Sequence, residues 1–152
     1  MGEVARLFVA PARRTPMHER TEVRAIENRG LEGCAHGRSG SRRQVLLIEV
    51  ETLHELGLRP GVTRENLTTL GIRLADLASG RLLRAGRAVL EVTVPCEPCA
   101  HMDAIREGLK GELQGRRGVL CRVVEGGLIR RGDALDVIEP VATRNEENKG
   151  DA

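Results

Sequence analysis

The chain has almost no aromatic side chains: its 152 residues include no Trp, no Tyr and a single Phe, Phe8. Proteins that hold single-stranded nucleic acid stack the bases on aromatic side chains, and this chain lacks such platforms. The net charge is only +2, from 24 basic and 22 acidic residues, so there is little general attraction for a polyanion. The composition therefore predicts that nucleic acid is not a partner.

Long apolar runs are also missing. No stretch approaches the ~20 apolar residues that a membrane-spanning helix requires, and the first residues do not form a signal peptide. We therefore expect a cytoplasmic protein without a membrane partner, in which the four cysteines are mostly reduced.

The length and the 40% hydrophobic content are those of one globular domain with a real core. Residues 1–140 carry the patterned sequence and are predicted to form this domain. Residues 141–152 are polar and without periodicity, and are predicted to be a C-terminal tail.

Short strands dominate the patterned part. Residues 4–9, 21–27, 44–48 and 88–94 alternate or are rich in β-branched residues, as strands are. Residues 83–92 and 129–138 resemble one another, each with a glycine turn between two apolar segments, and each predicts a hairpin. Together these patterns predict a mostly β fold, a small barrel with short helices inserted between strands.

The most informative motif is Pro95-Cys96-Glu97-Pro98-Cys99, at the end of a predicted strand. Pro95 ends the strand because it has no N–H to donate. The apolar spacing from Met102 to Leu113 predicts a helix, and Pro98 suits its first position. Cys99 would then lie in the first turn, where the helix dipole lowers the pKa of a thiol. We therefore expect Cys99 to be the most reactive thiol.

We expect different roles for the other cysteines. Cys121 lies on the core face of a strand and should be the least reactive. Cys34 and His36 belong to a glycine-rich loop at residues 30–40, and with Cys96 and Cys99 they could hold zinc. His101 is a further possible ligand. The Cys-x-His spacing of the loop is unusual for zinc, so structural zinc at Cys96 and Cys99 is the alternative interpretation.

Residues 37–43 contain three arginines among glycines and serines, but no Gly-Lys-Ser/Thr follows, so the segment is not a Walker loop. Its arginines either clamp an anion or form a solvated loop, and the pattern alone does not separate these two possibilities.

Several motifs, in order, resemble the MOSC domain, the C-terminal module of molybdenum cofactor sulfurase. Residues 30–36 resemble its G-x-x-G-D-x-H segment, and residues 43–47 resemble the R-Q-V strand that follows. Residues 61–67 resemble its G-x-x-x-E-N segment, and Pro98-Cys99 falls where the family has Pro-Cys. The resemblance runs from about Thr21 to Pro140. One departure is Cys34, which stands where the family usually has aspartate.

The resemblance implies a barrel related to the β-barrel domain of pyruvate kinase. It implies molybdenum cofactor (molybdopterin) binding, a persulfide carried on a cysteine, or both, with Cys99 as the catalytic residue and molybdenum ligand and Cys96 as a weaker candidate ligand. The residues expected to bind the cofactor, chosen for phosphate recognition around the glycine-rich loop, are Arg43, Asn66, His36, Arg38, Arg42 and Arg64.

The family is also associated with pyridoxal phosphate, but this chain has no recognisable lysine motif for it and no reductase motif. Sulfur or electrons must then come from a partner, a cysteine desulfurase or a molybdoenzyme or reductase. The alternative function is a small binding module with structural zinc or no metal. An enzyme of unrelated chemistry comes third, because no Ser/His/Asp or paired-carboxylate arrangement stands out.

Overall fold

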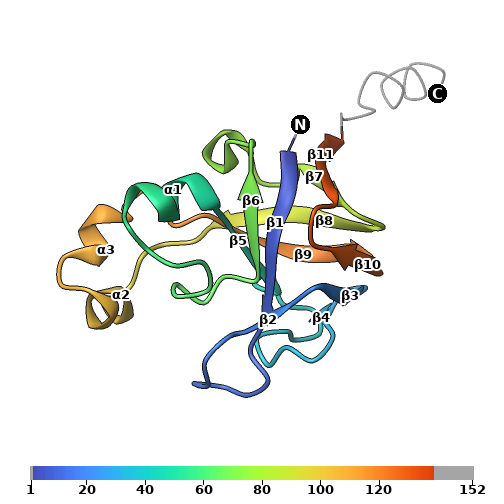
Figure 1. Ribbon diagram of the computed structural model, residues 1–152. Helices are drawn as coiled ribbons and strands as arrows, with labels where there is room; N and C mark the ends of the chain where they lie inside the picture. Colours follow the sequence, from blue (N-terminus) through green and yellow to red (C-terminus); the bar gives the residue numbers. More distant parts are fainter. Residues whose placement is uncertain (1, 139–152) are drawn as a thin grey trace.

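Most of the chain forms a closed β-barrel in the computed structural model, which describes residues 2–138 (Figure 1). In chain order the elements are β1 (Gly2–Val9), β2 (His18–Arg20), β3 (Glu22–Ile26), β4 (Gly30–Leu31), β5 (Val45–Glu49), α1 (Val50–Glu55), β6 (Leu67–Leu70), the short 3-10 helix η1 (Leu74–Asp76), β7 (Leu82–Ala85), β8 (Ala88–Pro95), α2 (Ala100–Ile105), α3 (Leu109–Glu112), β9 (Val119–Glu125), β10 (Gly127–Arg130) and β11 (Ala134–Ile138).

The barrel strands follow the order β11-β7-β8-β9-β5-β6-β1, and pairing of β1 with β11 closes the ring. Neighbours are antiparallel except β5 and β6, which are parallel because α1 and the segment after it carry the chain back to the same end. β2 extends the barrel beside β1, and β10, β3 and β4 form a small separate sheet. The expectation of a mostly β barrel with short inserted helices is confirmed.

Strand β5 carries a continuous apolar run whose side chains are buried on both faces of the sheet. Val45 and Leu47 point into the barrel interior, where they join the main core cluster. Leu46 points to the opposite side and packs with Cys96 and Leu120. Because side chains alternate along a strand, a continuous apolar run of this kind is buried on both faces.

The three α-helices lie together on one side of the barrel (Figure 1). Ile48 at the end of β5 packs against Leu53 of α1 and against the apolar residues of α2 and α3. This apolar cluster, separate from the barrel core, holds α1, α2 and α3 against the end of β5. It therefore determines where the segment between β8 and α2, which carries Cys96 and Cys99, lies relative to the barrel.

The helix predicted across residues 102–113 is divided in two. α2 ends at Ile105, and α3 begins after Gly108, whose φ of 83° is left-handed and interrupts a helix. The Asp103 side chain accepts a hydrogen bond from the Lys110 backbone N–H at 2.9 Å and joins the two pieces. Met102, Leu109 and Leu113 are all buried, so the apolar spacing identified the buried positions correctly but not the break.

Of the two predicted hairpins, only the first forms. β7 and β8 pair across a tight turn at Gly86. β10 and β11 do not pair with each other; β10 pairs with β3, and β11 pairs with β7 and β1. The reason is that Gly132 and Asp133 hydrogen-bond to Val4 of β1, at 2.7 and 2.8 Å, so the turn transfers the chain from the small sheet into the barrel.

No helix within residues 2–138 combines the length and the apolar character needed to cross a membrane. The tail expected at residues 141–152 lies outside the described part of the chain, so the domain boundary at residue 140 stays a prediction.

Two leucines on neighbouring strands test this architecture. Leu47 has no exposed surface, whereas Leu70 at the end of β6 is 41% exposed. Leu47→Ala should lower the free energy of unfolding by about 2–5 kcal/mol, because it leaves a cavity in the core. Leu70→Ala is the matched control and should change it by less than about 1 kcal/mol. Urea unfolding followed by circular dichroism measures both, and equal losses would contradict the placement of β5.

Candidate functional site

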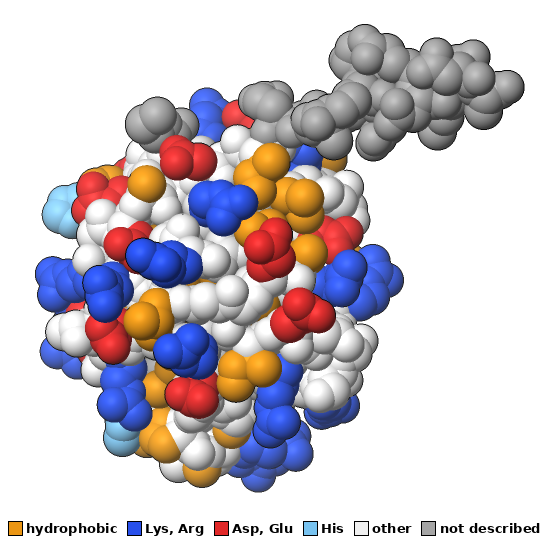
Figure 2. Space-filling model, turned by 90° about the vertical axis from the view of Figure 1, so that its right-hand side faces the viewer, with side chains coloured by type: hydrophobic (Ala, Val, Ile, Leu, Met, Phe, Trp, Pro, Cys, Tyr) orange, Lys and Arg blue, Asp and Glu red, His pale blue; other side chains and the backbone are white. Residues whose placement is uncertain are grey.

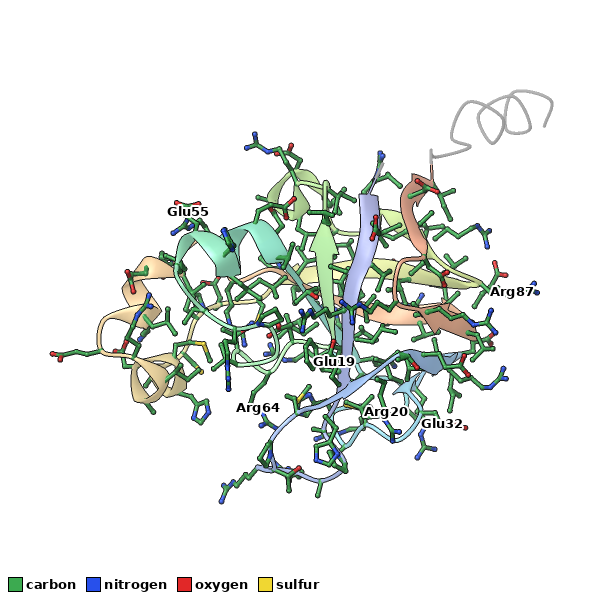
Figure 3. The ribbon with its side chains drawn as sticks, in the orientation of Figure 1. Glu19, Arg20, Glu32, Glu55, Arg64 and Arg87 are labelled. Atoms are coloured by element: carbon green, nitrogen blue, oxygen red, sulfur yellow. The ribbon has the colours of Figure 1, made fainter. Side chains whose placement is uncertain are left out.

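A cavity of about 430 Å³ opens at one end of the barrel. Five connecting segments meet there: the β1–β2 loop, the glycine-rich loop, the turn before β6, the segment between β8 and α2, and the segment between α3 and β9. Figure 3 shows Arg64 at this end, far from Arg87 at the β7–β8 turn. The lining residues are Arg13, Ala35, His36, Arg38, Ser41, Arg43, Leu46, Arg64, Asn66, Cys96, Glu97, Cys99, Arg117 and Leu120.

Asn66, which is buried, connects the strands beneath the cavity. Its side-chain oxygen accepts the Leu46 N–H at 3.0 Å, and its backbone N–H donates to the Leu46 carbonyl at 2.8 Å. On the other side, its amide nitrogen donates to the Phe8 carbonyl at 3.1 Å, and its backbone carbonyl accepts the Phe8 N–H at 2.7 Å. Asn66 therefore ties β1 to β5 at the cavity floor, which explains this part of the G-x-x-x-E-N motif.

Glu65, beside it, holds the preceding turn. Its buried carboxylate accepts the Gly61 N–H, and the Thr63 hydroxyl donates to it at 2.6 Å. Gly61 has a φ of 91°, and a Cβ there would lie 2.9 Å from the Phe8 ring, so only glycine fits. The motif thus builds a rigid turn that leads into β6.

Arg64 lies in that turn with a left-handed φ of 65°, which costs a non-glycine residue about 1–3 kcal/mol. Its guanidinium donates to the Thr15 carbonyl at 2.7 Å and lies 3.2 Å from the His36 ring nitrogen Nε2. The residue therefore clamps the β1–β2 loop to the glycine-rich loop across the cavity mouth. Its strained backbone is what directs the side chain there.

The glycine-rich loop is closed tightly on itself. Gly30 has a φ of 135°, and a Cβ there would meet the Gly37 Cα at 3.0 Å. Buried Gln44 fastens the loop to the barrel, because its amide donates to the Arg38 carbonyl at 3.2 Å while its oxygen accepts the Val123 N–H at 2.9 Å. Sequence analysis had used Gln44 only as part of a motif and had not identified this role.

Cys99 is exposed and Cys96 is buried, and both line the cavity. Cys99 is the N-cap of α2, with extended φ and ψ and no side-chain capping bond, rather than a first-turn residue. α2 has only six residues, so the helix-dipole argument for Cys99 loses most of its physical basis. Burial raises the pKa of Cys96, while the Arg117 and Arg43 guanidiniums act in the opposite direction.

Arg117 is the most important residue that sequence analysis missed. It is only 7% exposed; its Nη2 donates to the Thr63 carbonyl at 2.6 Å, and its Nη1 has no hydrogen-bond partner among the described residues. The neighbouring Gly118 passes so close to β5 that a Cβ would overlap the Leu47 carbonyl, and its own carbonyl accepts the Cys96 N–H at 2.9 Å. Gly115 and Gly118, on either side of Arg116-Arg117, were the sequence feature that could have identified this close approach of the backbone.

Cys34 is partly buried between the loop and the barrel. Its Sγ accepts the Ala10 N–H and the Asn66 side-chain N–H, both at 3.4 Å. Burial acts to raise the pKa of this thiol, but hydrogen bonds from the His36 side chain and from the Ala10 and His36 backbone outweigh it and lower the pKa from 9.0 to about 7. Sequence analysis did not foresee a readily ionised thiol at this position.

The charges around the cavity are strongly one-sided. Five guanidiniums face a single carboxylate, that of Glu97; the arginines are Arg13, Arg38, Arg43, Arg64 and Arg117. By contrast, the side of the molecule in Figure 2 carries basic and acidic side chains interspersed. A cavity lined in this way favours an anionic ligand, and arginine forks suit phosphate or carboxylate groups.

Comparison with known proteins identifies the family of the chain. The family model described as "MOSC domain" matches residues 36–136. This chain belongs to the MOSC domain family. MOSC domains, as a family, are associated with the molybdenum cofactor.

Solved structures share the MOSC fold at low sequence identity. The YuaD protein of Bacillus subtilis superposes with a TM-score of 0.76 at 17% identity, over 90% of this chain and 96% of that one. YiiM of Geobacillus stearothermophilus gives 0.74 at 19% identity, over 91% and 76%. YiiM of Escherichia coli gives 0.71 at 22% identity, over 93% and 71%.

A curated human relative, pleckstrin homology domain-containing family G member 4B, is 29% identical over 136 residues. The match covers 88% of this MOSC chain but only 8% of that protein, so the chain spans a small part of its length.

The MOSC barrel brings nearly all of the expected site residues to one cavity: Cys99, Cys96, Arg43, Asn66, His36, Arg38 and Arg64 all line it. Arg42 does not; its exposed side chain lies outside the lining, and its backbone carbonyl accepts a hydrogen bond from Thr93.

The zinc alternative finds little support. Within residues 2–138, no group of three or more His, Cys, Asp or Glu side chains is placed to hold a metal ion. A structural zinc site needs four ligands in a closed tetrahedron, and the exposed His101 does not line the cavity with Cys96 and Cys99.

The thiols should ionise at different pH values. Cys34 should react with iodoacetamide at a rate that rises with a midpoint near pH 7 and falls about tenfold for each pH unit below it, because only the thiolate attacks. Cys121, which is completely buried and whose pKa burial raises, should remain unlabelled until the protein unfolds. Peptide mapping of timed reactions measures both. Labelling of Cys121 in the folded protein would contradict its place in the core.

Proposed function

We propose that the cavity binds the molybdenum cofactor through its phosphate group, and that Cys99 offers its sulfur to the metal. Two lines support the proposal: the family's association with this cofactor and the residues that line the cavity. The single observation that carries it is the excess of guanidiniums beside an exposed thiol in one cavity.

Arg117 is central to the phosphate side of the argument. A buried guanidinium with an unpartnered nitrogen is expensive, since leaving a buried charge uncompensated costs about 3–5 kcal/mol. A phosphate in the cavity would compensate that charge by Coulomb attraction in a low-dielectric setting. Arg43 is exposed, and its charge acts on the nearby Cys96 thiol. Its guanidinium is therefore available to bind the same phosphate.

Cys99 completes the site because thiolate is a soft ligand suited to a transition metal. The bound cofactor would supply the redox chemistry of molybdenum. The chain's own residues do the rest: the arginines hold the anionic end, Asn66 keeps the floor rigid, and Arg64 joins the two loops at the mouth. Buried Leu46 and Leu120 exclude water from the floor.

Sulfur or electrons for such a site would come from a partner, a cysteine desulfurase or a molybdoenzyme or reductase. Such a partner would approach the exposed side of the cavity, where Cys99 and Glu97 lie. The cytoplasm is the expected compartment of such a protein, because it keeps thiols reduced.

Cofactor retention tests the proposal. The protein should be purified from a host that makes the cofactor, and molybdenum, pterin and zinc measured. Arg43→Ala should weaken retention by about 10- to 150-fold, because a charged hydrogen bond contributes about 1.5–3 kcal/mol. Cys99→Ser should lose molybdenum more than pterin. Arg87→Ala, an exposed arginine at the far end of the barrel, is the matched control and should retain both (Figure 3).

Absence of pterin and molybdenum from the wild-type protein in that host would contradict the proposal. Zinc that is lost equally from Cys96→Ser and Cys99→Ser, together with a lower melting temperature in both, would favour the zinc-binding module instead.

A further inference from the structure

One hydrogen bond at the mouth of the cavity fixes the protonation state of His36. The Nη2 atom of Arg64 lies 3.2 Å from the ring nitrogen Nε2 of His36. Arginine stays charged and can only donate hydrogen bonds, so Nε2 must be the acceptor and bears no proton. His36 is therefore neutral in this arrangement, with its ring proton on Nδ1.

Arg64 is held in place independently of His36. Its Nη1 atom donates to the Thr15 carbonyl at 2.7 Å, and its left-handed backbone belongs to the turn that the Glu65 carboxylate fastens. A second proton on the His36 ring would remove the acceptor and place a positive charge beside the guanidinium. Protonation would therefore break the Arg64–His36 contact and leave the Nε2–H group of His36 free to donate elsewhere.

His36 lines a cavity whose other charged groups are almost all positive. The titratable and charged groups around it are Arg13 of the β1–β2 loop, Cys34, Arg38 and Arg43 of its own loop, Arg64 of the turn before β6, Cys96, Glu97 and Cys99 of the segment after β8, and Arg117. A further positive charge is unfavourable there unless an anion compensates it. Arg117, which is 7% exposed and whose Nη1 has no partner within residues 2–138, is an independent sign of an anionic ligand.

We propose that the cavity takes up a proton on His36 when it binds an anion, so that its affinity for anions rises as the pH falls. The anion compensates the new charge, and the imidazolium, released from Arg64, donates its Nε2–H to the anion. The inference rests on the proposed function, because it describes how the phosphate of the cofactor is recognised, but it holds for any doubly charged oxyanion.

The direction of the pH dependence follows from linkage. The proton comes from the solvent and is bound only in the anion-loaded state, so a higher proton concentration favours loading. By reciprocity, a bound anion favours the protonated form of His36 by the same factor. The arginines contribute nothing to this dependence, because guanidinium does not lose its proton in this range.

Sulfate binding to the cofactor-free full-length protein tests the proposal. Sulfate has the shape of a phosphate group, but its charge stays constant over the range in which histidine titrates, so a pH dependence reports the protein. Isothermal titration calorimetry at constant ionic strength should show an affinity that rises about tenfold from about pH 8 to about pH 5.5. Titrations in two buffers with different ionisation enthalpies should show net proton uptake on binding.

Three variants identify the group that takes up the proton. His36→Gln keeps an acceptor for Arg64 but cannot be protonated in this range, so both the rise in affinity and the proton uptake should be lost. His18→Gln removes an exposed histidine of β2 and is the matched control, which should behave like the wild type. Cys34→Ser removes a nearby thiol whose pKa is about 7, and it should keep the rise.

A spectroscopic measurement on the wild type keeps the test valid if a variant does not fold. With ¹⁵N-labelled histidine rings, nuclear magnetic resonance at neutral pH should show an unprotonated Nε2 on His36 without sulfate. Both ring nitrogens should bear protons when the protein is saturated with sulfate.

Sulfate binding that is absent or independent of pH would overturn the proposal. So would a wild-type rise in His36→Gln, loss of the rise in Cys34→Ser, or a His36 ring that stays neutral in the saturated protein. None of these results would affect cofactor retention, which is scored separately by pterin and molybdenum. Failure of retention together with proton-linked sulfate binding would instead remove the cofactor proposal and leave the proton-linked anion site.

Discussion

The site depends on the backbone and side-chain hydrogen bonds of one buried residue, Asn66. Four bonds join it to Leu46 of β5 and Phe8 of β1, and a fifth reaches the Cys34 sulfur. Buried polar groups that are fully satisfied are rigid, because any movement leaves a donor or acceptor without a partner. The floor of the cavity, where β1 and β5 meet, therefore depends on this one residue.

Around that floor, the fold brings together positively charged side chains that repel one another. Arg38 and Arg43 come from the glycine-rich loop, and Arg13, Arg64 and Arg117 come from three other segments of the chain. Two of them already donate to backbone carbonyls: Arg64 to Thr15, and Arg117 to Thr63. These bonds hold the guanidiniums in place but leave most of their charge uncompensated. The arrangement resembles a functional site more than a stabilising one, since stability alone would favour pairing each buried charge.

Much of the fold was predictable because strands are encoded locally. Alternation and β-branched runs located β1, β3, β5 and β8, and glycine located the β7–β8 turn. The sequence prediction was wrong at two places, the second hairpin and the helix between Met102 and Leu113. The Gly132 turn reads as a hairpin, but its hydrogen bonds to Val4 send β11 into the barrel. The apolar residues spaced from Met102 to Leu113 are buried as expected, but Gly108 divides the helix in two.

By itself, the sequence determined that this is a MOSC barrel with a Pro-Cys motif, and which loop residues could meet an anion. Those conclusions depend on residue type and order, which need no coordinates. Only the tertiary structure turned Arg42 away, buried Arg117 with no partner for its Nη1 among residues 2–138, and placed the N–H groups of Ala10 and Asn66 beside Cys34. The physical reason is that burial, charge compensation and thiol ionisation depend on neighbours in space, and the folded chain brings these together from distant segments, such as Asn66 and Phe8, which are 58 residues apart.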